Sequence, residues 1–137
     1  MPQDITIDTV EVKKVYESGA LLSETPRVNG ERYGIRKRYY ETGAIWWEIP
    51  FVNGIRHGIA KGYYESGTLW YETPYVNGKE HGIEKRYYPT GALRCEAPYV
   101  NGERHGISRD YDRDNSNICC LTLYNMDREV AIVVSNI

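Results

Sequence analysis

Apolar and polar positions follow one pattern along this chain, and the pattern repeats every 24 residues. The clearest copy begins at Tyr64 and has the sequence YESGTLWYETPYVNGKEHGIEKRY. The four copies occupy residues 16–39, 40–63, 64–87 and 88–111. A fixed period of this size indicates a repeat array, in which each unit is one supersecondary element that buries apolar surface against its neighbours. Function is therefore sought in the array as a whole.

Two turn signals divide each unit. An Asn-Gly dipeptide occurs once per copy, at Asn29-Gly30, Asn53-Gly54, Asn77-Gly78 and Asn101-Gly102. It is a strong hairpin signal because both residues tolerate positive φ. A Ser-Gly or Thr-Gly dipeptide marks the other turn, at Gly19, Gly43, Gly67 and Gly91. The segments between the turns are rich in Tyr, Trp, Ile, Val and Thr, which favour strands. Each unit is predicted to be a β-hairpin, and four units give about eight antiparallel strands.

A proline also recurs in each unit, at Pro26, Pro50, Pro74 and Pro98. Proline lacks the N–H that a strand donates to its neighbour, so we expect it to end the first strand of each unit or to lie at a bulge.

Caps are predicted at both ends of the array. Residues 4–12 alternate β-branched and polar side chains, so residues 1–15 are assigned as an N-terminal capping strand. Residues 112–137 are assigned as a C-terminal capping hairpin, with a turn at residues 125–128. Ile132, Val133 and Val134 are expected to pack on the last unit. Such caps protect unpaired strand edges, although the C-terminal edge could instead bind a partner or form a dimer.

The assignment of side chains to the two sheet faces depends on the Asn-Gly turn. If Val-Asn-Gly forms a three-residue loop, Ser23 lies opposite Ile35 and Leu22 lies opposite Arg36. A uniform face then carries the positions that vary little, namely Leu21, Ile35, Tyr39 and their equivalents. A variable face carries Leu22, Arg36 and Arg38, then Trp46, Ala60 and Gly62, then Trp70, Glu84 and Arg86, then Arg94, Ser108 and Asp110. A two-residue loop would flip one strand and spoil this assignment.

Composition narrows the class of protein. A mean hydropathy of -0.60 with 41% hydrophobic residues is typical of a soluble globular chain. The net charge is -2, because 17 Lys and Arg face 19 Asp and Glu, so no nucleic-acid partner is expected. The three cysteines are odd in number and two are adjacent, which indicates a reducing compartment. No secretory signal or membrane-spanning run is recognised, so a cytoplasmic location is predicted.

The motifs YY-E-[ST]-G and VNG-x-x-H-G-I stand at fixed offsets in the units, which resemble MORN repeats of the bacterial variant family. The resemblance covers the four units, whereas the regular proline departs from the family pattern and the caps match nothing in it. It implies an all-β fold, an elongated single-layer antiparallel sheet of four tandem β-hairpin repeats with terminal β caps. The family includes antitoxin components of toxin–antitoxin pairs, and eukaryotic relatives are adaptors or proposed lipid binders, so these functions are expectations by analogy.

Two ladders of polar residues are candidates for a metal site or a catalytic site. His57, His81 and His105 occupy equivalent positions, but equivalent residues lie roughly 10 Å apart because each unit advances by two strands. Zinc ligands lie about 2.1 Å from one ion, so these histidines are predicted to support turns. The carboxylates Glu24, Glu48, Glu72 and Glu96 are likewise too far apart for acid–base catalysis. They are expected to pair with Lys37, Lys61, Lys85 and Arg109 or with turn N–H groups.

Neither the cysteines nor the glycines predict a catalytic or cofactor site. Cys119 and Cys120 are adjacent in a predicted strand, so they should point to opposite faces and form no redox pair. The glycine-containing turns precede no helix and form no phosphate-binding loop. We therefore predict a non-enzymatic protein with no cofactor and no metal site.

Aromatic residues are the remaining candidates. Trp46, Trp47, Trp70 and Tyr71 cluster on adjacent units, either as cross-strand packing or as an interface hot spot. Consecutive Trp46 and Trp47 are expected to face opposite sides of the sheet. The predicted partner contacts are Trp46, Trp70, Arg94, Arg36, Glu84, Arg86 and Asp110.

The leading functional hypothesis is a protein-binding module that neutralises another protein, such as a cognate toxin or effector, as an antitoxin or immunity protein does. The alternative is a peripheral membrane or phospholipid binder or a scaffolding adaptor. Lys and Arg beside exposed Trp favour membrane binding, and the nearly balanced charge disfavours it. A third hypothesis is self-assembly, with a monomer or a homodimer through edge strands.

Overall fold

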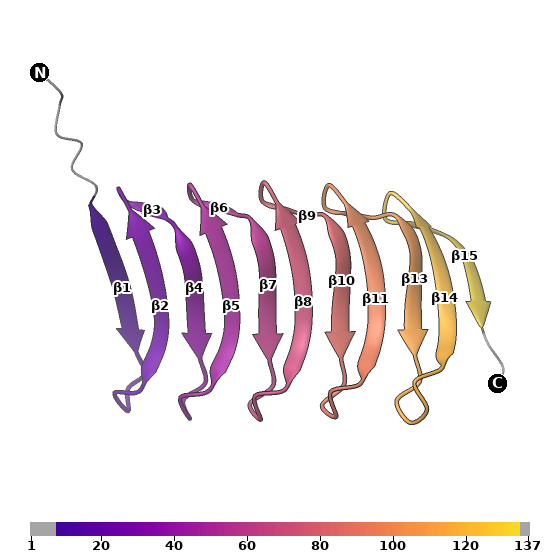
Figure 1. Cartoon of the computed structure of the whole chain (residues 1–137), viewed down its shortest axis with the longest axis horizontal. Coiled ribbons are helices and arrows are strands. Elements are labelled where there is room, and N and C mark those ends of the chain that lie inside the picture. The colour runs from indigo at the N-terminus through magenta and orange to yellow at the C-terminus, as the bar shows by residue number, and fades with distance from the viewer. Residues whose placement is uncertain (1–7, 135–137) are drawn as a thin grey trace, which may run out of the picture.

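The computed structural model describes residues 8–134, which form fifteen β-strands and no helix (Figure 1). The strands are β1 (Thr9–Val15), β2 (Leu21–Val28), β3 (Glu31–Arg32), β4 (Gly34–Tyr39), β5 (Ile45–Val52), β6 (Ile55–Arg56), β7 (Gly58–Tyr63), β8 (Leu69–Val76), β9 (Lys79–Glu80), β10 (Gly82–Tyr87), β11 (Leu93–Val100), β12 (Glu103–Arg104), β13 (Gly106–Tyr111), β14 (Ile118–Asn125) and β15 (Arg128–Val134). The predicted first strand began at residue 4, and its part up to residue 7 lies outside the described range.

All the strands belong to one open antiparallel sheet, and its longer strands lie side by side in sequence order. The order is β1-β2-β4-β5-β7-β8-β10-β11-β13-β14-β15, and the two-residue strands β3, β6, β9 and β12 each pair with the strand that precedes them. Figure 1 shows the resulting elongated sheet, with the two ends of the chain at opposite ends of the array. The predicted fold class is confirmed, although each unit contains three strands rather than two.

The predicted three-residue loop is wrong. Asn29 and Gly30 have φ of 50° and 81°, and Val28 pairs with Glu31, so the turn has two residues. The chain then leaves the ladder near Gly34, whose φ is 84°, before β4 resumes the pairing. The structure therefore places Ser23 opposite Arg38, where the predicted register placed it opposite Ile35.

The proline does not end its strand. Strand β5 continues through Pro50 to Val52. Pro50 is tolerated because the segment paired with it, between β6 and β7, departs from the regular ladder here. The Pro50 carbonyl accepts a hydrogen bond from the His57 N–H at 3.1 Å. The ring also packs on Gly58, where an added Cβ would lie 3.0 Å from the Pro50 Cγ. The departure thus explains both the proline and the glycine of the His-Gly motif.

A β-bulge begins the first long strand of each unit. Between β4 and β5, Tyr39 pairs with Ile45 and Arg38 pairs with Trp47, which leaves Trp46 as the extra residue. The same register shift recurs at Leu22, Trp70, Arg94 and Cys119. The bulge shifts side-chain parity by one residue. It therefore offsets the change in turn length, and Ile45 lies with Ile35 and Tyr39 on the uniform face as predicted.

The thin core of the sheet lies on the variable face. The buried side chains are Ser23, Thr25, Phe51, Ala60, Thr73, Glu84 and Thr122, and the pairing register assigns all of them to that face. On the uniform face, Ile35, Ile59, Ile83 and Ile107 are 44–54% exposed. The uniform positions therefore form a regular surface, with no second layer of the described chain packed on them.

Hydrogen bonds tie the units together in the same way along the array. The hydroxyl of Tyr64, the first residue of its unit, donates to the carbonyl of Tyr87, the last residue, at 2.7 Å. Tyr16, Tyr40 and Tyr88 make the equivalent bond. Each Asn-Gly turn also bonds to the preceding unit, as when the Gly78 N–H donates to the Arg56 carbonyl at 2.8 Å. The tyrosine bonds close each unit on itself, and the turn bonds link neighbouring units.

The C-terminal hairpin continues the array. Met126 and Asp127 form a turn with φ of 51° and 62°, and the Asp127 N–H donates to the Arg104 carbonyl as the Asn-Gly turns do to their neighbours. The expectation that Ile132, Val133 and Val134 pack on the last unit is wrong, because β15 is an edge strand and these side chains are 54–64% exposed.

Candidate functional site

The variable face of β4 and β5 carries a cluster of arginine and tryptophan side chains. The Arg38 guanidinium lies over the Trp46 ring and the Arg36 guanidinium lies over the Trp47 ring, each 5.1 Å from the ring centroid. Arg36 and Arg38 are two residues apart in one strand, so they share a face. The expectation that Trp46 and Trp47 face opposite sides is therefore wrong, because the bulge turns both rings to the variable face.

The bulge position is one of the positions at which the units differ. The Trp46 ring stacks on Tyr40 at a centroid distance of 5.3 Å, and the Trp70 ring lies 5.8 Å from Tyr64. In the next unit the Arg94 guanidinium takes the same place, 5.9 Å from the Tyr88 ring. In the second, third and fourth units the first tyrosine is thus a platform on which the sequence places a Trp or an Arg.

In the middle of the face, Tyr71 covers a glycine. Trp70 packs edge-on against Tyr71 with 5.3 Å between ring centroids. Tyr71 lies opposite Gly62, where an added Cβ would be 2.0 Å from the tyrosine Cε1. Gly62 therefore makes room for the ring, and burial raises the pKa of the Tyr71 hydroxyl.

The C-terminal half of the variable face is hollowed and has mixed charge. A depression of about 290 Å³ includes four of the predicted contacts in its lining, Glu84, Arg86, Arg94 and Asp110. The Arg86 Nε donates to Glu84 at 2.7 Å, and the Thr73 hydroxyl donates to the same carboxylate at 3.0 Å. The bond to Glu84 raises the pKa of Arg86. Glu84 and Arg86 thus satisfy each other within the protein.

The N-terminal half of the face is basic. Within residues 8–134, no carboxylate lies within 4.0 Å of the Arg36 or Arg38 guanidinium, and the Nε atoms of both are buried without a hydrogen-bond partner. Burial lowers the pKa of Arg36, and the neighbouring positive charges of Arg32, Arg38, Arg27 and Arg56 lower it further. The two halves of one face therefore differ in charge balance.

The structure places all seven predicted contacts on the variable face but does not bring them to one point. Arg36 on β4 and Glu84 on β10 are four strands apart, roughly 19 Å at ~4.8 Å per strand. The contacts form an extended surface, of which Trp70 occupies the middle. The predicted contacts omitted Trp47, Arg38 and Tyr71, because their place beside Trp46 and Trp70 depends on a bulge that the residue pattern does not reveal.

Two of the three histidines, His57 and His81, support turns as predicted. The Nδ1 of His57 accepts a hydrogen bond from the Asn77 N–H at 3.3 Å, and the Nδ1 of His81 accepts one from the Asn101 N–H at 3.4 Å. Each of these histidines thus steadies the Asn-Gly turn of the following unit.

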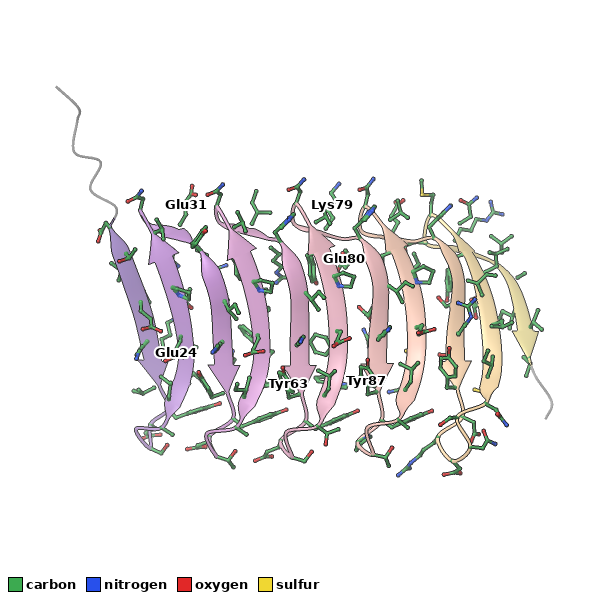
Figure 2. The ribbon with its side chains drawn as sticks, in the orientation of Figure 1. Glu24, Glu31, Tyr63, Lys79, Glu80 and Tyr87 are labelled. Carbon is green, nitrogen blue, oxygen red and sulfur yellow. The ribbon has the colours of Figure 1, made fainter. Side chains whose placement is uncertain are left out.

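The carboxylate ladder lies on the uniform face. Glu24 is directly opposite Lys37, and Glu48 is opposite Lys61, but among the described residues no ion pair within 4.0 Å joins either pair, and Glu24 instead lies 3.5 Å from Lys13. The closest partners are tyrosine hydroxyls: Tyr39 donates to Glu24 at 2.6 Å and Tyr63 donates to Glu48 at 3.1 Å. The equivalent bonds run from Tyr87 to Glu72 and from Tyr111 to Glu96. Figure 2 shows Tyr63 and Tyr87 at equivalent places in neighbouring units.

The cysteines do not alternate regularly across the sheet. Cys119 is the bulge residue, and its Sγ donates to the Asp110 carbonyl at 3.4 Å. Cys120 pairs with Asp110, and its Sγ lies 3.7 Å from the Thr122 hydroxyl on the variable face. Burial raises the pKa of the third thiol, Cys95. The three cysteines are free thiols and are not joined by a disulfide.

Comparison with known proteins identifies the repeat. The model of the MORN repeat variant matches residues 32–53, 56–77 and 80–101. No curated protein matches the chain. A crystal structure of TarM is 13% identical, with a TM-score of 0.47; the match covers 89% of this chain and 20% of that one, so this chain spans about a fifth of the length of TarM. No helix in residues 8–134 is long and apolar enough to cross a membrane.

The matched repeats begin later in the pattern than the 24-residue units that start at Tyr16, Tyr40 and Tyr64. The segment 32–53 contains β4 and β5, which pair along six residue positions, whereas β2 and β4 pair at only two. The better-paired hairpin therefore corresponds to the repeat of the family. MORN repeats generally mediate protein or membrane interactions. The model of the MORN repeat variant thus matches three tandem segments of this chain.

Proposed function

We propose that this protein is a non-enzymatic, cytoplasmic protein-binding module that neutralises a partner protein through the variable face, as an antitoxin or immunity protein does. The observation that carries the proposal is the gathering of Trp46, Trp70 and Arg94 on tyrosine platforms at the positions where the units differ. Trp, Tyr and Arg are the residues that most often dominate binding energy at protein interfaces. The antitoxin class itself rests on the family resemblance.

The dimensions of the face suit a protein partner. Arg36 and Asp110 are six strands apart, roughly 29 Å at ~4.8 Å per strand. A surface of this length can supply the roughly 800 Å² that each partner buries in a typical stable interface. The repeated tyrosine bonds hold the strands in place before binding, which reduces the entropy lost on association.

The arrangement of titratable groups favours binding over catalysis. A catalytic site needs unlike groups that converge on one reacting atom. The carboxylates of the uniform face repeat roughly 10 Å apart. Glu84, the buried carboxylate of the variable face, is already hydrogen-bonded by Arg86 and Thr73. These groups support a rigid surface.

The test uses the product of the reading frame beside this one. Co-expression should relieve growth inhibition caused by that product, and the two purified proteins should form a complex. The double variant Trp46→Ala/Trp70→Ala should weaken the complex by at least about tenfold, since each anchor of this kind contributes on the order of 2 kcal/mol. The matched control is Ile59→Ala/Ile83→Ala, which removes two exposed apolar side chains from the uniform face.

If the tryptophan variant is folded by circular dichroism and still binds as tightly as the wild type, the variable face is the wrong surface. If the isoleucine variant alone loses binding, the uniform face is the interface.

A membrane-binding role is the second candidate. It is favoured by the row of exposed isoleucines, Ile35, Ile59, Ile83 and Ile107, on the uniform face. The opposed Glu and Lys residues give this face little net charge, which weakens attraction to anionic lipid. Co-sedimentation with phosphatidylglycerol vesicles at physiological salt, lost in Ile59→Ala/Ile83→Ala, would reverse the ranking of the two candidates.

A further inference from the structure

The basic half of the variable face is defined here as the arginine–tryptophan patch. Its members are Arg32, Arg36, Arg38, Trp46, Trp47 and Phe51. The pairing register places no Asp or Glu on this face in the strands from β1 to β8, and the first carboxylates on this face beyond β8 are Glu80 and Glu84. The patch is thus a local surplus of positive charge on a chain whose net charge is -2.

The third unit shows what the patch lacks. Arg86 is the repeat equivalent of Arg38, and it donates its Nε to Glu84, two residues earlier in the same strand, at 2.7 Å. The equivalent of Glu84 in the first unit is Arg36. The side chain next to Arg86 on its strand face is therefore a hydrogen-bond acceptor, whereas the side chain next to Arg38 is another guanidinium. The Nε atoms of Arg36 and Arg38 are both buried and have no hydrogen-bond partner.

This arrangement is costly in the free protein. A buried N–H without an acceptor loses its bonds to water and gains none in return, and the cost is higher for charged groups. Two like charges on adjacent same-face positions add repulsion. Stacking on Trp46 and Trp47 offsets part of this cost and fixes the planes of both guanidinium groups. An acceptor supplied from outside would satisfy both groups, and a carboxylate matches the guanidinium fork best.

We infer that the arginine–tryptophan patch binds an acidic, extended segment of the partner protein, one of whose Asp or Glu carboxylates occupies beside Arg38 the place that Glu84 occupies beside Arg86. The inference rests on the proposed function and names the chemistry of the partner. The carboxylate accepts from Arg36 and Arg38, while Trp46 and Trp47 flank it with apolar surface that excludes water and strengthens the ion pairs.

A protein carboxylate fits the patch better than a nucleic acid or a lipid surface. Nucleic-acid-binding domains usually have a strongly basic surface with a pI above about 9, whereas the pI of this chain is ≈ 5.9. The arginine Nε atoms are buried between neighbouring side chains, so the acceptor must be a narrow group that enters between the rings. Glu84 and Arg86 meet that requirement within this same sheet.

The direct test uses the full-length protein and a fluorescein-labelled decapeptide of alternating Glu and Ser. Fluorescence anisotropy should show saturable binding to the wild type, and none for the decapeptide in which Lys replaces Glu. The decisive variant is Arg36→Glu, which recreates in the first unit the Glu84–Arg86 pair that the third unit already contains. Its internal carboxylate should occupy Arg38 and weaken peptide binding by at least about tenfold, as expected when a close charge pair is lost.

Arg113→Glu is the matched control. It makes the same change of charge at an exposed residue in the turn that follows the array, and it should leave peptide affinity within about twofold. Equal binding of the peptide by the wild type and Arg36→Glu overturns the inference. So does the absence of binding up to about 1 mM peptide, a concentration at which even weak complexes of −4 kcal/mol form. Tighter binding of single-stranded DNA or phosphatidylglycerol vesicles than of the peptide also overturns it.

The same variant separates this inference from the proposed function. In the co-expression test, Arg36→Glu should lose binding of the partner protein, as Trp46→Ala/Trp70→Ala should. If Arg36→Glu keeps the partner while the tryptophan variant loses it, the proposed function stands and the acidic segment does not bind here. If both variants keep the partner, the variable face itself is excluded.

Discussion

The hydroxyl of Tyr39 donates a 2.6 Å hydrogen bond to the carboxylate of Glu24, and the same bond closes every unit of the array on the uniform face. Burial, the larger cause, and the Glu24 carboxylate together raise the pKa of Tyr39 to about 12. In return the hydroxyl is the main reason that the pKa of Glu24 is lowered. Because neutral Tyr39 and ionised Glu24 are both favoured by folding, the bond links stability to pH at both ends of the scale.

At alkaline pH the wild type should lose the contribution that the Tyr39 hydroxyl makes to the free energy of unfolding, a contribution that Tyr39→Phe lacks at every pH. The folded pKa of Tyr39 is raised from 10.0 to about 12, so its contribution is complete below pH 10 and disappears as the pH rises through 12. At pH 7 the variant should be less stable by about 1–3 kcal/mol, the usual range for a hydrogen bond to a charged group. Urea unfolding at several pH values should show this difference shrinking between pH 10 and 12. A constant difference across that window would contradict the linkage.

At acid pH the same variant should shift the titration of Glu24. The folded pKa of Glu24 is lowered from 4.5, so its contribution is present above pH 4.5 and is lost as the pH falls through the lowered value. Removing the Tyr39 hydroxyl removes the largest cause of the lowering, and the Glu24 pKa should move upward. Carboxyl chemical shifts measured by NMR from pH 2 to 7 test this directly. An unchanged Glu24 titration in Tyr39→Phe would show that Lys13, 3.5 Å away, dominates instead.

Gly62→Ala should destabilise the protein because Tyr71 occupies the space of the missing side chain. The added Cβ would lie 2.0 Å from the Tyr71 Cε1, so the ring must move. Overpacking of this kind typically costs 1–3 kcal/mol. The same substitution in a Tyr71→Cys background should be nearly neutral, since Cys95 is the natural equivalent of Tyr71 in the next unit. Thermal unfolding of the four proteins forms a double-mutant cycle, and additive losses would mean that the two residues do not interact.

The repeats and the class of fold were predictable from sequence because each signal recurs at one spacing. A hairpin is indicated within a single unit by Asn29-Gly30 and the Tyr-rich segments beside it, and the same signals recur in every other unit. The register was not predictable in the same way. It depends on the departure at Gly34, which leaves a proline and a glycine at fixed places without specifying the pairing, and on the bulge at Trp46, which no residue type demands. The two shifts compensate at Leu21 and its equivalents, which keep their predicted face, whereas Ser23 and Glu24 lie on the faces opposite to those that the predicted register gives.

The candidate site was predictable only in part, for the same reason. Positions such as Arg36 and Glu84 stand out because they vary at a fixed place in the repeat. The stacking of Arg36 on Trp47 together with that of Arg38 on Trp46, by contrast, requires two consecutive tryptophans on one face, and strict alternation forbids that. Only the bulge permits it. Variation between repeats therefore located the face, while the contacts within the face followed from backbone geometry.

His57→Phe should loosen the turn of the following unit without unfolding the array. The Nδ1 of His57 accepts the Asn77 N–H at 3.3 Å, and Phe keeps a ring of similar size without an acceptor. The expected loss is about 0.5–1.5 kcal/mol, the net value of one hydrogen bond. The local readout is amide hydrogen exchange, which should accelerate at Asn77 and remain unchanged at Asn29, two units away. Unchanged exchange at Asn77 would mean that the histidine supports the turn by packing alone.

Val133→Lys should reduce self-association at the C-terminal edge. Strand β15 pairs only with β14 among the described strands, and Val130, Ile132, Val133 and Val134 are 54–64% exposed along it. An apolar strand with a free edge offers backbone N–H and C=O groups to a second chain, and a lysine at such an edge is a common natural protection. Light scattering should therefore show the wild type associating as its concentration rises, while Val133→Lys stays monomeric. Ile59→Lys adds the same charge to the uniform face, far from either edge, and should associate like the wild type. If the wild type stays monomeric throughout, the edge is protected by its own twist, and the homodimer hypothesis fails at β15.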